Sequence, residues 1–237
     1  MNDLNVIYED NHIIVVEKPA GVLSQAGSLD LPDLLTIIKN YIKVKYQKPG
    51  NVFLGLVHRL DTNVGGVMVY AKTSKAASRL SKEIRTHNFN KNYLAIVEGN
   101  IDVGKTETLT DYLAKDEETK TAYFTDDLDG KISTLTYKSL ANKSVDNNNY
   151  TLLKIELETG RFHQIRAQLS KHLFPIINDS KYGKKQIDFN LGLFAYNINF
   201  KHPTLDKAMN FTIVPKDYPF NMFQTELDLL EENLWNY

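Results

Sequence analysis

The sequence predicts an α+β fold: a single domain with a mixed, largely antiparallel sheet flanked by helices. Segments with the pattern of strands dominate, and a few amphipathic helical stretches lie between them. Leu153, Ile155 and Leu157 alternate with charged residues, as expected for a strand with one solvated face. No Gly/Ser linker and no fixed-period repeat divides the 237 residues, so we expect one domain over residues 1–237.

The first part of the chain mixes predicted strands with predicted helices. Residues 5–8 and 12–17 have the pattern of a β-hairpin. Apolar residues at helical spacing predict a helix over about residues 31–45, with Asp30 as its N-cap and a proline in the first turn. A buried strand at 67–71, an amphipathic helix at 74–86 and a strand at 93–97 follow.

The second part is predicted to be mainly β-structure. Residues 142–149 are polar and predict a loop between two strands. The stretch 159–166 opens a helix, and residues 221–235 have helical character. The further strands are expected near 121–125, 132–140, 150–158, 193–200 and 208–214.

Composition limits the possible chemistry. The chain has no cysteine, which excludes disulfides, thiolate zinc sites and a cysteine nucleophile. The N-terminus carries an acid where a signal peptide carries bases, and no apolar run approaches membrane-spanning length. We therefore expect a soluble cytoplasmic protein without a membrane partner.

The net charge of −1 hides two blocks of opposite sign. Residues 72–91 contain six basic side chains and one acid, whereas residues 116–129 contain six acids and one base. Such blocks cancel in the total but not in the local field that a phosphate backbone meets. From charge alone, each block is either a solvated face or part of a binding surface.

Three polar clusters lie at the ends of predicted strands, where functional loops commonly collect. They are "EKPAG" at 17–21, "HRLD" at 58–61 and "TGRFHQIR" at 159–166. In the second cluster, Asp61 is the only acid, and Arg59 is close in sequence. A carboxylate beside a guanidinium stays ionised, which suits a nucleophile or a base better than a general acid.

Other reaction classes fit less well. His58 and Asp61 supply only two metal ligands, so we expect no metal site. A glycosidase needs a second carboxylate, but Glu156 and Glu158 alternate with apolar residues as a solvated strand face does. The sequence also has no Gly-rich phosphate loop with a lysine and no Gly-x-Ser-x-Gly elbow.

Several motifs in order resemble the RluA-type family of RNA pseudouridine synthases. The resemblance implies the pseudouridine synthase fold and no metal or organic cofactor. The substrate that the resemblance implies is ribosomal or transfer RNA, modified at specific uridines. We expect the protein to act as a monomer. The motifs are "VVEKPAGVLSQAG" (15–27), "HRLDTNVGGVMVYAKT" (58–73), "KNYLAIVEG" (91–99), "LETGRFHQIRAQLS" (157–170), "NDSKYG" (178–183) and "FKHP" (200–203).

The same resemblance implies roles for four residues. Asp61 matches the catalytic aspartate, which attacks the base or the ribose of a flipped-out uridine. Tyr93 matches the tyrosine that stacks on that base, and Arg166 matches the arginine that pairs with the aspartate. Arg59 matches the arginine that is inserted into the RNA where the base leaves.

Each of these residues has a plainer alternative. Asp61 could belong to a structural ion pair, Tyr93 to the core and Arg166 to a helix surface. A catalytically silent RNA-binding protein of this fold and a base-releasing glycosylase are the alternative functions. Further candidate RNA contacts are His58, Lys72, Arg161, His163 and Gln164, although local hydrogen bonding is an equal alternative for the two histidines.

The sequence departs from the family pattern in three places. Asn63-Val64-Gly65 replaces a usual Thr-Ser-Gly step, so a hydroxyl-bearing turn is lost. Asn178 stands where glycine is usual, and Phe194 stands where a histidine often occurs. The chain also leaves no room for the N-terminal S4 module of many relatives, so we expect a short form without it.

Overall fold

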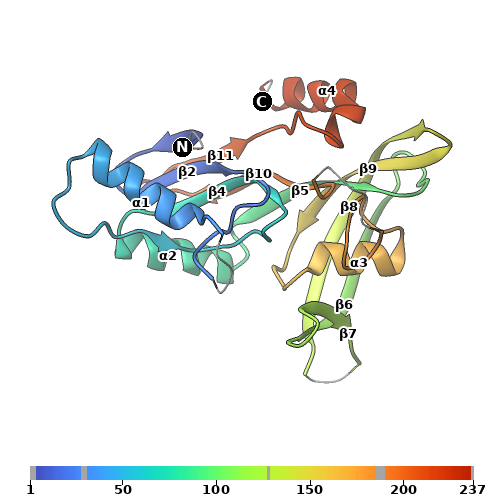
Figure 1. Ribbon diagram of the computed structural model, residues 1–237, viewed down its shortest axis with the longest axis horizontal. Helices are drawn as coiled ribbons and strands as arrows, with labels where there is room; N and C mark the ends of the chain where they lie inside the picture. The colour runs from blue at the N-terminus through green and yellow to red at the C-terminus, as the bar shows by residue number, and fades with distance from the viewer. Residues whose placement is uncertain (1–3, 28–30, 127–128, 185–189, 236–237) are drawn as a thin grey trace. The chain divides into compact units, whose positions relative to one another are not determined.

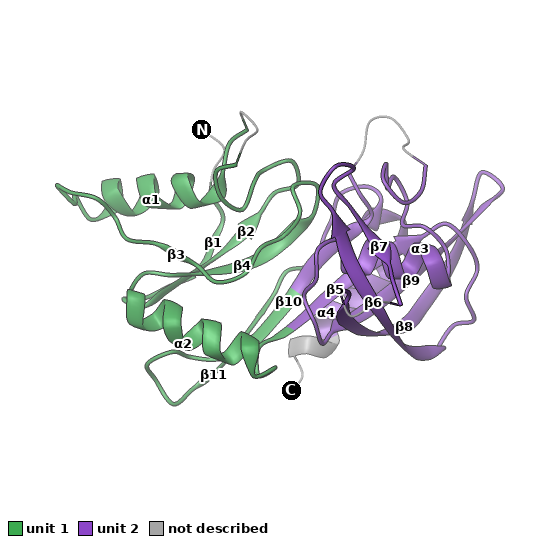
Figure 2. Cartoon of the chain, turned by 90° about the horizontal axis from the view of Figure 1, so that it is seen from below, with its two compact units in different colours: residues 1–90, 197–213 green, residues 91–196, 214–237 purple. Residues whose placement is uncertain are grey.

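A computed structural model describes all residues except 1–3, 28–30, 127–128, 185–189 and 236–237 (Figure 1). Strands and helices are mixed along the chain, which confirms the predicted α+β class. The chain forms two compact units (Figure 2). Unit 1 contains residues 1–90 and 197–213, and unit 2 contains residues 91–196 and 214–237. Within the described residues, no helix is long and apolar enough to cross a membrane.

Unit 1 is built on antiparallel ladders. Strand β2 pairs with β1 on one side and with β4 on the other, β3 pairs with β4, and β11 pairs with β10. The predicted hairpin and the predicted strand at 67–71 are therefore confirmed. The bounds are β1 (Val6–Glu9), β2 (Ile13–Lys18), β3 (Gly55–Leu56), β4 (Gly65–Ala71), β10 (Leu193–Lys201, of which 197–201 belong to this unit) and β11 (Ala208–Thr212).

Both faces of β2 and β4 are buried, because a helix lies on each side of these strands (Figure 2). Helix α2 (Ser74–Arg85) matches its prediction, and its Ala76 and Leu80 pack with Ile13 and Val69. Its N-cap Thr73 accepts a hydrogen bond from the backbone in the first turn. The apolar stripe of α2 thus covers one face, and its basic residues point away from that core.

Helix α1 (Leu34–Lys45) begins later than predicted. Its N-cap is Asp33, whose carboxylate accepts a hydrogen bond from a backbone N–H in the first turn. The backbone of Leu23 bonds to that of Pro32 and of Leu34, which holds the preceding residues extended. The predicted start at 31 is therefore wrong, and the predicted cap, Asp30, lies outside the described residues.

Unit 2 contains an antiparallel sheet in the order β5-β9-β8-β6-β7. The residues of β10 that precede Asn197 also belong to this unit. The bounds are β5 (Asn90–Val97), β6 (Thr106–Asp116), β7 (Thr121–Phe124), β8 (Lys131–Val145), β9 (Asn148–Leu157), α3 (Gln164–His172), a 3₁₀ turn η1 (Phe220–Phe223) and α4 (Gln224–Trp235).

The two faces of this sheet are covered by different helices. Leu94 and Leu152 lie in one core cluster with Phe223 and Leu227, so η1 and α4 cover their face. Helix α3 covers the other face, where the carboxylate of Asp111 accepts hydrogen bonds from side chains of that helix. The helix predicted to open within 159–166 and the helix predicted at 221–235 are both confirmed, the second as a 3₁₀ turn followed by an α-helix.

Two predictions for unit 2 need correction. The predicted polar loop at 142–149 is instead the end of a long hairpin, in which β8 and β9 stay paired up to Val145 and Asn148. Asp146 and Asn147 form its turn with φ of 50° and 65°, which these residue types tolerate. Strand β6 was not predicted, because its sequence is rich in threonine and acids and buries few apolar side chains.

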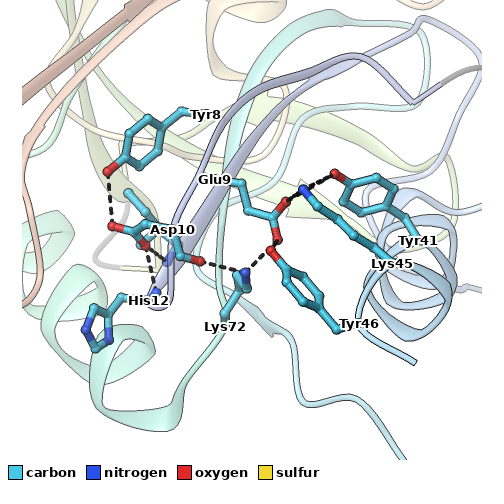
Figure 3. A network of polar contacts seen from close by, with 9 residues as sticks. Tyr8, Glu9, Asp10, His12, Tyr41, Lys45, Tyr46 and Lys72 are labelled. Atoms are coloured by element: carbon cyan, nitrogen blue, oxygen red, sulfur yellow. Dashed lines mark hydrogen bonds and ion pairs between the residues drawn. The ribbon is translucent and has the colours of Figure 1, made fainter. Parts of the chain in front are cut away.

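A polar network joins β1, α1 and the residue after β4 in unit 1 (Figure 3). Glu9 lies at its centre, and its side chain is 6% exposed. One oxygen accepts from Lys72 Nζ at 2.6 Å and from Tyr46. The other accepts from Lys45 Nζ at 2.7 Å and from Tyr41. Burial raises the pKa of Glu9, but these hydrogen bonds outweigh burial and lower it to about 2.

We expect Glu9→Gln to lower the free energy of unfolding by roughly 2 kcal/mol at neutral pH, because Lys72 loses its carboxylate. The full pKa shift of Glu9 would correspond to a larger loss of free energy of unfolding. Lys45 is 44% exposed, however, and solvent screens its charge. The folded-state pKa of Glu9 lies below its ordinary value of 4.5, so its contribution is present above that pH and is lost as the pH falls toward 2.

Urea unfolding of both proteins at neutral pH and at about pH 3 measures this difference. The control is Glu118→Gln, since the side chain of this exposed glutamate has no hydrogen bond or ion pair within the described residues. A stability difference between wild type and Glu9→Gln that does not shrink at low pH contradicts the assignment.

Candidate active site

Hydrogen bonds within unit 1 hold the backbone on both sides of Asp61 in place. Ser24 Oγ donates to the carbonyl of Leu60 at 2.9 Å and accepts from its N–H at 3.1 Å. On the other side, the carbonyl of Thr62 accepts from the backbone N–H of Gly21 at 2.8 Å. The loop that follows β2 therefore fixes the position of the half-buried Asp61 through its two neighbours.

Lys18, for which no role was predicted, also supports the loop around Asp61. Its side chain is buried, and Nζ donates to the carbonyls of Val22 at 2.6 Å, Thr62 at 3.0 Å and Pro19 at 3.1 Å. Burial lowers the pKa of Lys18 to about 8, and the negative charge of Asp61 opposes this decrease. A buried positive charge is thus part of the electrostatic environment of Asp61. In the sequence, Lys18 belongs to the "EKPAG" cluster and to the family motif at 15–27, but neither shows its contacts.

These contacts account for the departure at Asn63-Val64-Gly65. Val64 is 2% exposed and its N–H donates to the carbonyl of Asp61 at 3.1 Å, which closes the turn. Asn63 is exposed. Since Leu60 and Thr62 are held through their backbones, the turn does not need the missing hydroxyl.

The other charged residues of the second cluster differ in their surroundings. His58 Nε2 accepts a hydrogen bond from the N–H of Val69 at 3.1 Å, and its ring lies 5.4 Å from that of Phe89. This gives His58 a structural role in holding the loop against β4. Arg59 is exposed and has no hydrogen bond or ion pair with any residue that the structure describes. Its guanidinium is therefore available to a ligand.

In unit 2, Tyr93 and helix α3 belong to the same face of the sheet. Tyr93 is 7% exposed and pairs with Ile155, which in turn pairs with Tyr137. Alternation along the strands places these residues on the face of Leu109 and Asp111, and α3 packs against that face. Tyr93 and the helix that carries Arg166 are thus brought to one face.

Arg166 forms a buried two-point ion pair with Asp179. Its Nε and Nη2 donate to the two carboxylate oxygens at 2.8 and 2.7 Å, and the side chains are 6% and 0% exposed. The N–H groups of Lys181 and Tyr182 also donate to Asp179. Burial raises the pKa of Asp179, but the hydrogen bonds and charge of Arg166 outweigh it, and the pKa is lowered. This partner of Arg166 was not predicted, and the pairing of Arg166 with Asp61 stays a prediction.

The remaining departures from the family pattern have local explanations. Asn178 has φ of 61°, a left-handed conformation that asparagine tolerates better than most residues and that glycine adopts freely. Phe194 packs against the core cluster of unit 2, and its ring lies 6.0 Å from that of Phe220. Neither substitution disturbs the Arg166–Asp179 pair.

Two of the predicted RNA contacts in unit 2 support the loop before α3. Gln164 is 2% exposed, and its Oε1 accepts from Thr159 Oγ1 at 2.8 Å and from the N–H of Arg161 at 3.0 Å. His163 is 9% exposed, and its Nδ1 lies 3.0 Å from Tyr182 Oη. Only Arg161 of this group is exposed. We therefore interpret Gln164 and His163 as structural residues.

Lys72, another predicted RNA contact, has partners within unit 1. Its side chain is 10% exposed, and Nζ donates to Glu9 and to the carbonyl of Asp10 at 2.6 Å each. The carboxylate of Glu9 thus neutralises the charge of Lys72 in the free protein, and its role as an RNA contact stays a prediction. The partner is distant in sequence, so the run of basic residues did not reveal it. The exposed bases of that run on α2 are Lys75, Arg79, Lys82 and Arg85.

The profile of a known family, RNA pseudouridylate synthase, matches residues 12–171. This span contains Asp61, Tyr93 and Arg166. It also contains the loop that pins Asp61. The chain belongs to the RNA pseudouridylate synthase family.

Curated relatives and solved structures agree with this assignment. Ribosomal large subunit pseudouridine synthase C of Buchnera aphidicola subsp. Schizaphis graminum is 31% identical, over 94% of this chain and 70% of its own length. The tRNA pseudouridine synthase C of Yersinia pestis is 31% identical, over 88% and 85%. Human RNA Pseudouridylate Synthase Domain Containing 4 has the same fold, with a TM-score of 0.73 at 20% identity, over 94% and 93% of the two chains.

Proposed function

We propose that this protein isomerises uridine to pseudouridine at specific sites in ribosomal or transfer RNA. The observation that carries the proposal is the family match over residues 12–171. Asp61 lies within this span, in the loop whose backbone is held by hydrogen bonds at Leu60 and Thr62. The curated relatives are named for action on both kinds of RNA, so both remain within the proposed substrate class.

The reaction exchanges one bond to the ribose for another. The bond from N1 of uracil to C1′ breaks, the base rotates, and C5 forms the new bond to C1′. The proton on C5 is lost to water and N1 gains a proton, so the product is an isomer of the substrate. Because a stacked base hides these atoms, the uridine must first leave the helix.

Asp61 is the proposed nucleophile. The carboxylate needs to be ionised and held in place, and the buried charge of Lys18 and the backbone contacts of its neighbours favour both. Tyr93 is proposed to stack on the flipped base, and Arg59 to fill the gap that the base leaves in the RNA. Arg166 acts near the base-binding face, where Asp179 fixes its orientation.

RNA labelled with tritium at C5 of uridine tests the proposal. We expect release of tritium to water and recovery of pseudouridine after digestion, without free uracil. Free uracil would instead identify a base-releasing glycosylase. Tight RNA binding without tritium release would identify a catalytically silent binding protein. Ribosomal RNA and transfer RNA from a strain that lacks the gene are the substrates to compare.

A further inference from the structure

Lys91, the second residue of β5, has a cationic side chain without an anionic partner. Most of its surface is buried, yet it has no hydrogen bond or ion pair with any described residue. The other buried cations differ in this respect: Lys18 has three carbonyl acceptors, and Lys72 and Arg166 each have a carboxylate. An ionised group that is partly buried without a partner loses part of its hydration at a cost in free energy, so its retention calls for an explanation.

The charged group next to Lys91 is another cation. Burial lowers the pKa of Lys91, and the positive charge of Arg161 lowers it further. Arg161 is exposed, and its Nε donates to the carbonyl of Ile132 at 3.1 Å. Its terminal Nη groups have no partner within the described residues. Two neighbouring cations that lack acids create a local field that favours an anion.

Gly160 leaves space for the Lys91 ammonium. A Cβ atom at this position would lie 2.9 Å from Nζ of Lys91. The φ angle of Gly160 lies outside the left-handed region, so its backbone does not require glycine. The absence of a side chain at position 160 therefore serves to admit the ammonium beside Arg161.

The pair lies on the face of the sheet that carries Tyr93. Lys91 and Tyr93 are two residues apart on β5, so their side chains point to the same face, about 7 Å apart along the strand. Arg161 belongs to the loop that leads into α3, which covers that face. A nucleotide whose base stacks on Tyr93 would thus have its backbone within reach of both cations.

We propose that Lys91 and Arg161 form a subsite for an RNA backbone phosphate beside the uridine bound at Tyr93. This inference rests on the proposed function, because it takes the base-binding role of Tyr93 from it. A phosphate diester supplies the anion that both cations lack, and its oxygens accept from an ammonium and from a guanidinium at once. The desolvated lysine is then compensated only when RNA is bound.

Salt-dependent RNA binding tests the subsite. The probe is an RNA hairpin of about 20 nucleotides with uridines in its loop, and fluorescence anisotropy is measured from about 50 to about 300 mM KCl. We expect Lys91→Gln to weaken binding about tenfold at low salt and to reduce the slope of log K against log salt by about 0.7 to 0.9. The control Lys216→Gln removes an exposed charge from the same unit, and we expect a change below about twofold.

Gly160→Ala gives a test that keeps every charge. Its methyl group displaces only the end of a flexible lysine, so the fold is retained while the ammonium moves. We expect it to weaken RNA binding by several-fold. A general charge effect predicts no change for Gly160→Ala and equal losses for Lys91→Gln and Lys216→Gln, and that result would overturn the subsite.

Stability of the free protein separates the subsite from a structural role. We expect Lys91→Met to unfold at the same urea concentration as wild type or at a higher one, because it removes a partly buried charge without a partner. A lower unfolding midpoint would show that Lys91 supports the fold and would overturn the proposal.

The outcome for the subsite is distinguishable from that for the catalytic activity. If wild type releases tritium but Lys91→Gln and Gly160→Ala bind RNA as wild type does, only the subsite is refuted. If wild type releases no tritium but both variants lose affinity as expected, the phosphate site stands and the proposed catalysis is refuted.

Discussion

Asp61→Asn is expected to abolish tritium release from C5-labelled RNA, with turnover reduced by about 10⁴-fold or more. Asparagine has nearly the shape of aspartate but cannot form the covalent bond of a nucleophilic mechanism. The affinity for RNA should stay within about threefold of wild type, because the loss falls on the reaction and not on the contacts to the backbone. Single-turnover kinetics and anisotropy with the same RNA measure the two quantities.

Asn63→Ala is the matched control for Asp61→Asn. It alters an exposed side chain in the same turn, and that turn is held by the backbones of Leu60 and Thr62. We expect turnover close to that of wild type. Turnover of Asp61→Asn that remains within tenfold of wild type would contradict the nucleophile assignment, whatever the control shows.

Asp179→Ala is expected to lower the free energy of unfolding by about 3–5 kcal/mol. The carboxylate is fully buried and holds the guanidinium of Arg166 at two points, with further hydrogen bonds from two backbone N–H groups. Its removal leaves these buried donors without their acceptor. Urea unfolding at neutral pH measures the loss.

The pH dependence has a definite sign. The pKa of Asp179 is lower in the folded protein than its ordinary value of 3.8. The stabilisation by the pair is therefore complete above that ordinary value and is lost as the pH falls through the folded-state pKa. Wild type and Asp179→Ala should differ less in acid than at neutral pH.

Asp206→Ala is the control for burial. Lys201 and Asp206 form an ion pair of 2.6 Å, but their side chains are 61% and 93% exposed. Solvent screens such a pair, so we expect an unfolding midpoint close to that of wild type. An effect of Asp179→Ala as small as that of Asp206→Ala would contradict a structural role for the buried pair.

The sequence by itself determined the elements whose signal is local. Helix α2 was predicted from its apolar stripe, and α3 from the stretch 159–166 that opens it. Strand β4 is a continuous apolar run, and all of its residues are buried. The family followed from several motifs in order, which Asp61, Tyr93 and Arg166 anchor. These features depend on residues close in sequence, so one chain is enough to predict them.

The tertiary structure decided the features that depend on distant residues. Lys72 pairs with Glu9 and Arg166 with Asp179, and no local pattern shows that either pair forms. Strand β6 and the end of the β8–β9 hairpin are polar, and their ladders with neighbouring strands hold them extended.

The support of Asp61 is of the same kind. Lys18 and Ser24 act on backbone carbonyls and N–H groups, which every residue has, so side-chain identity in the loop gave no sign of these contacts. The sequence named the carboxylate that we propose as the nucleophile. Only the folded backbone showed what holds it in place without the usual hydroxyl.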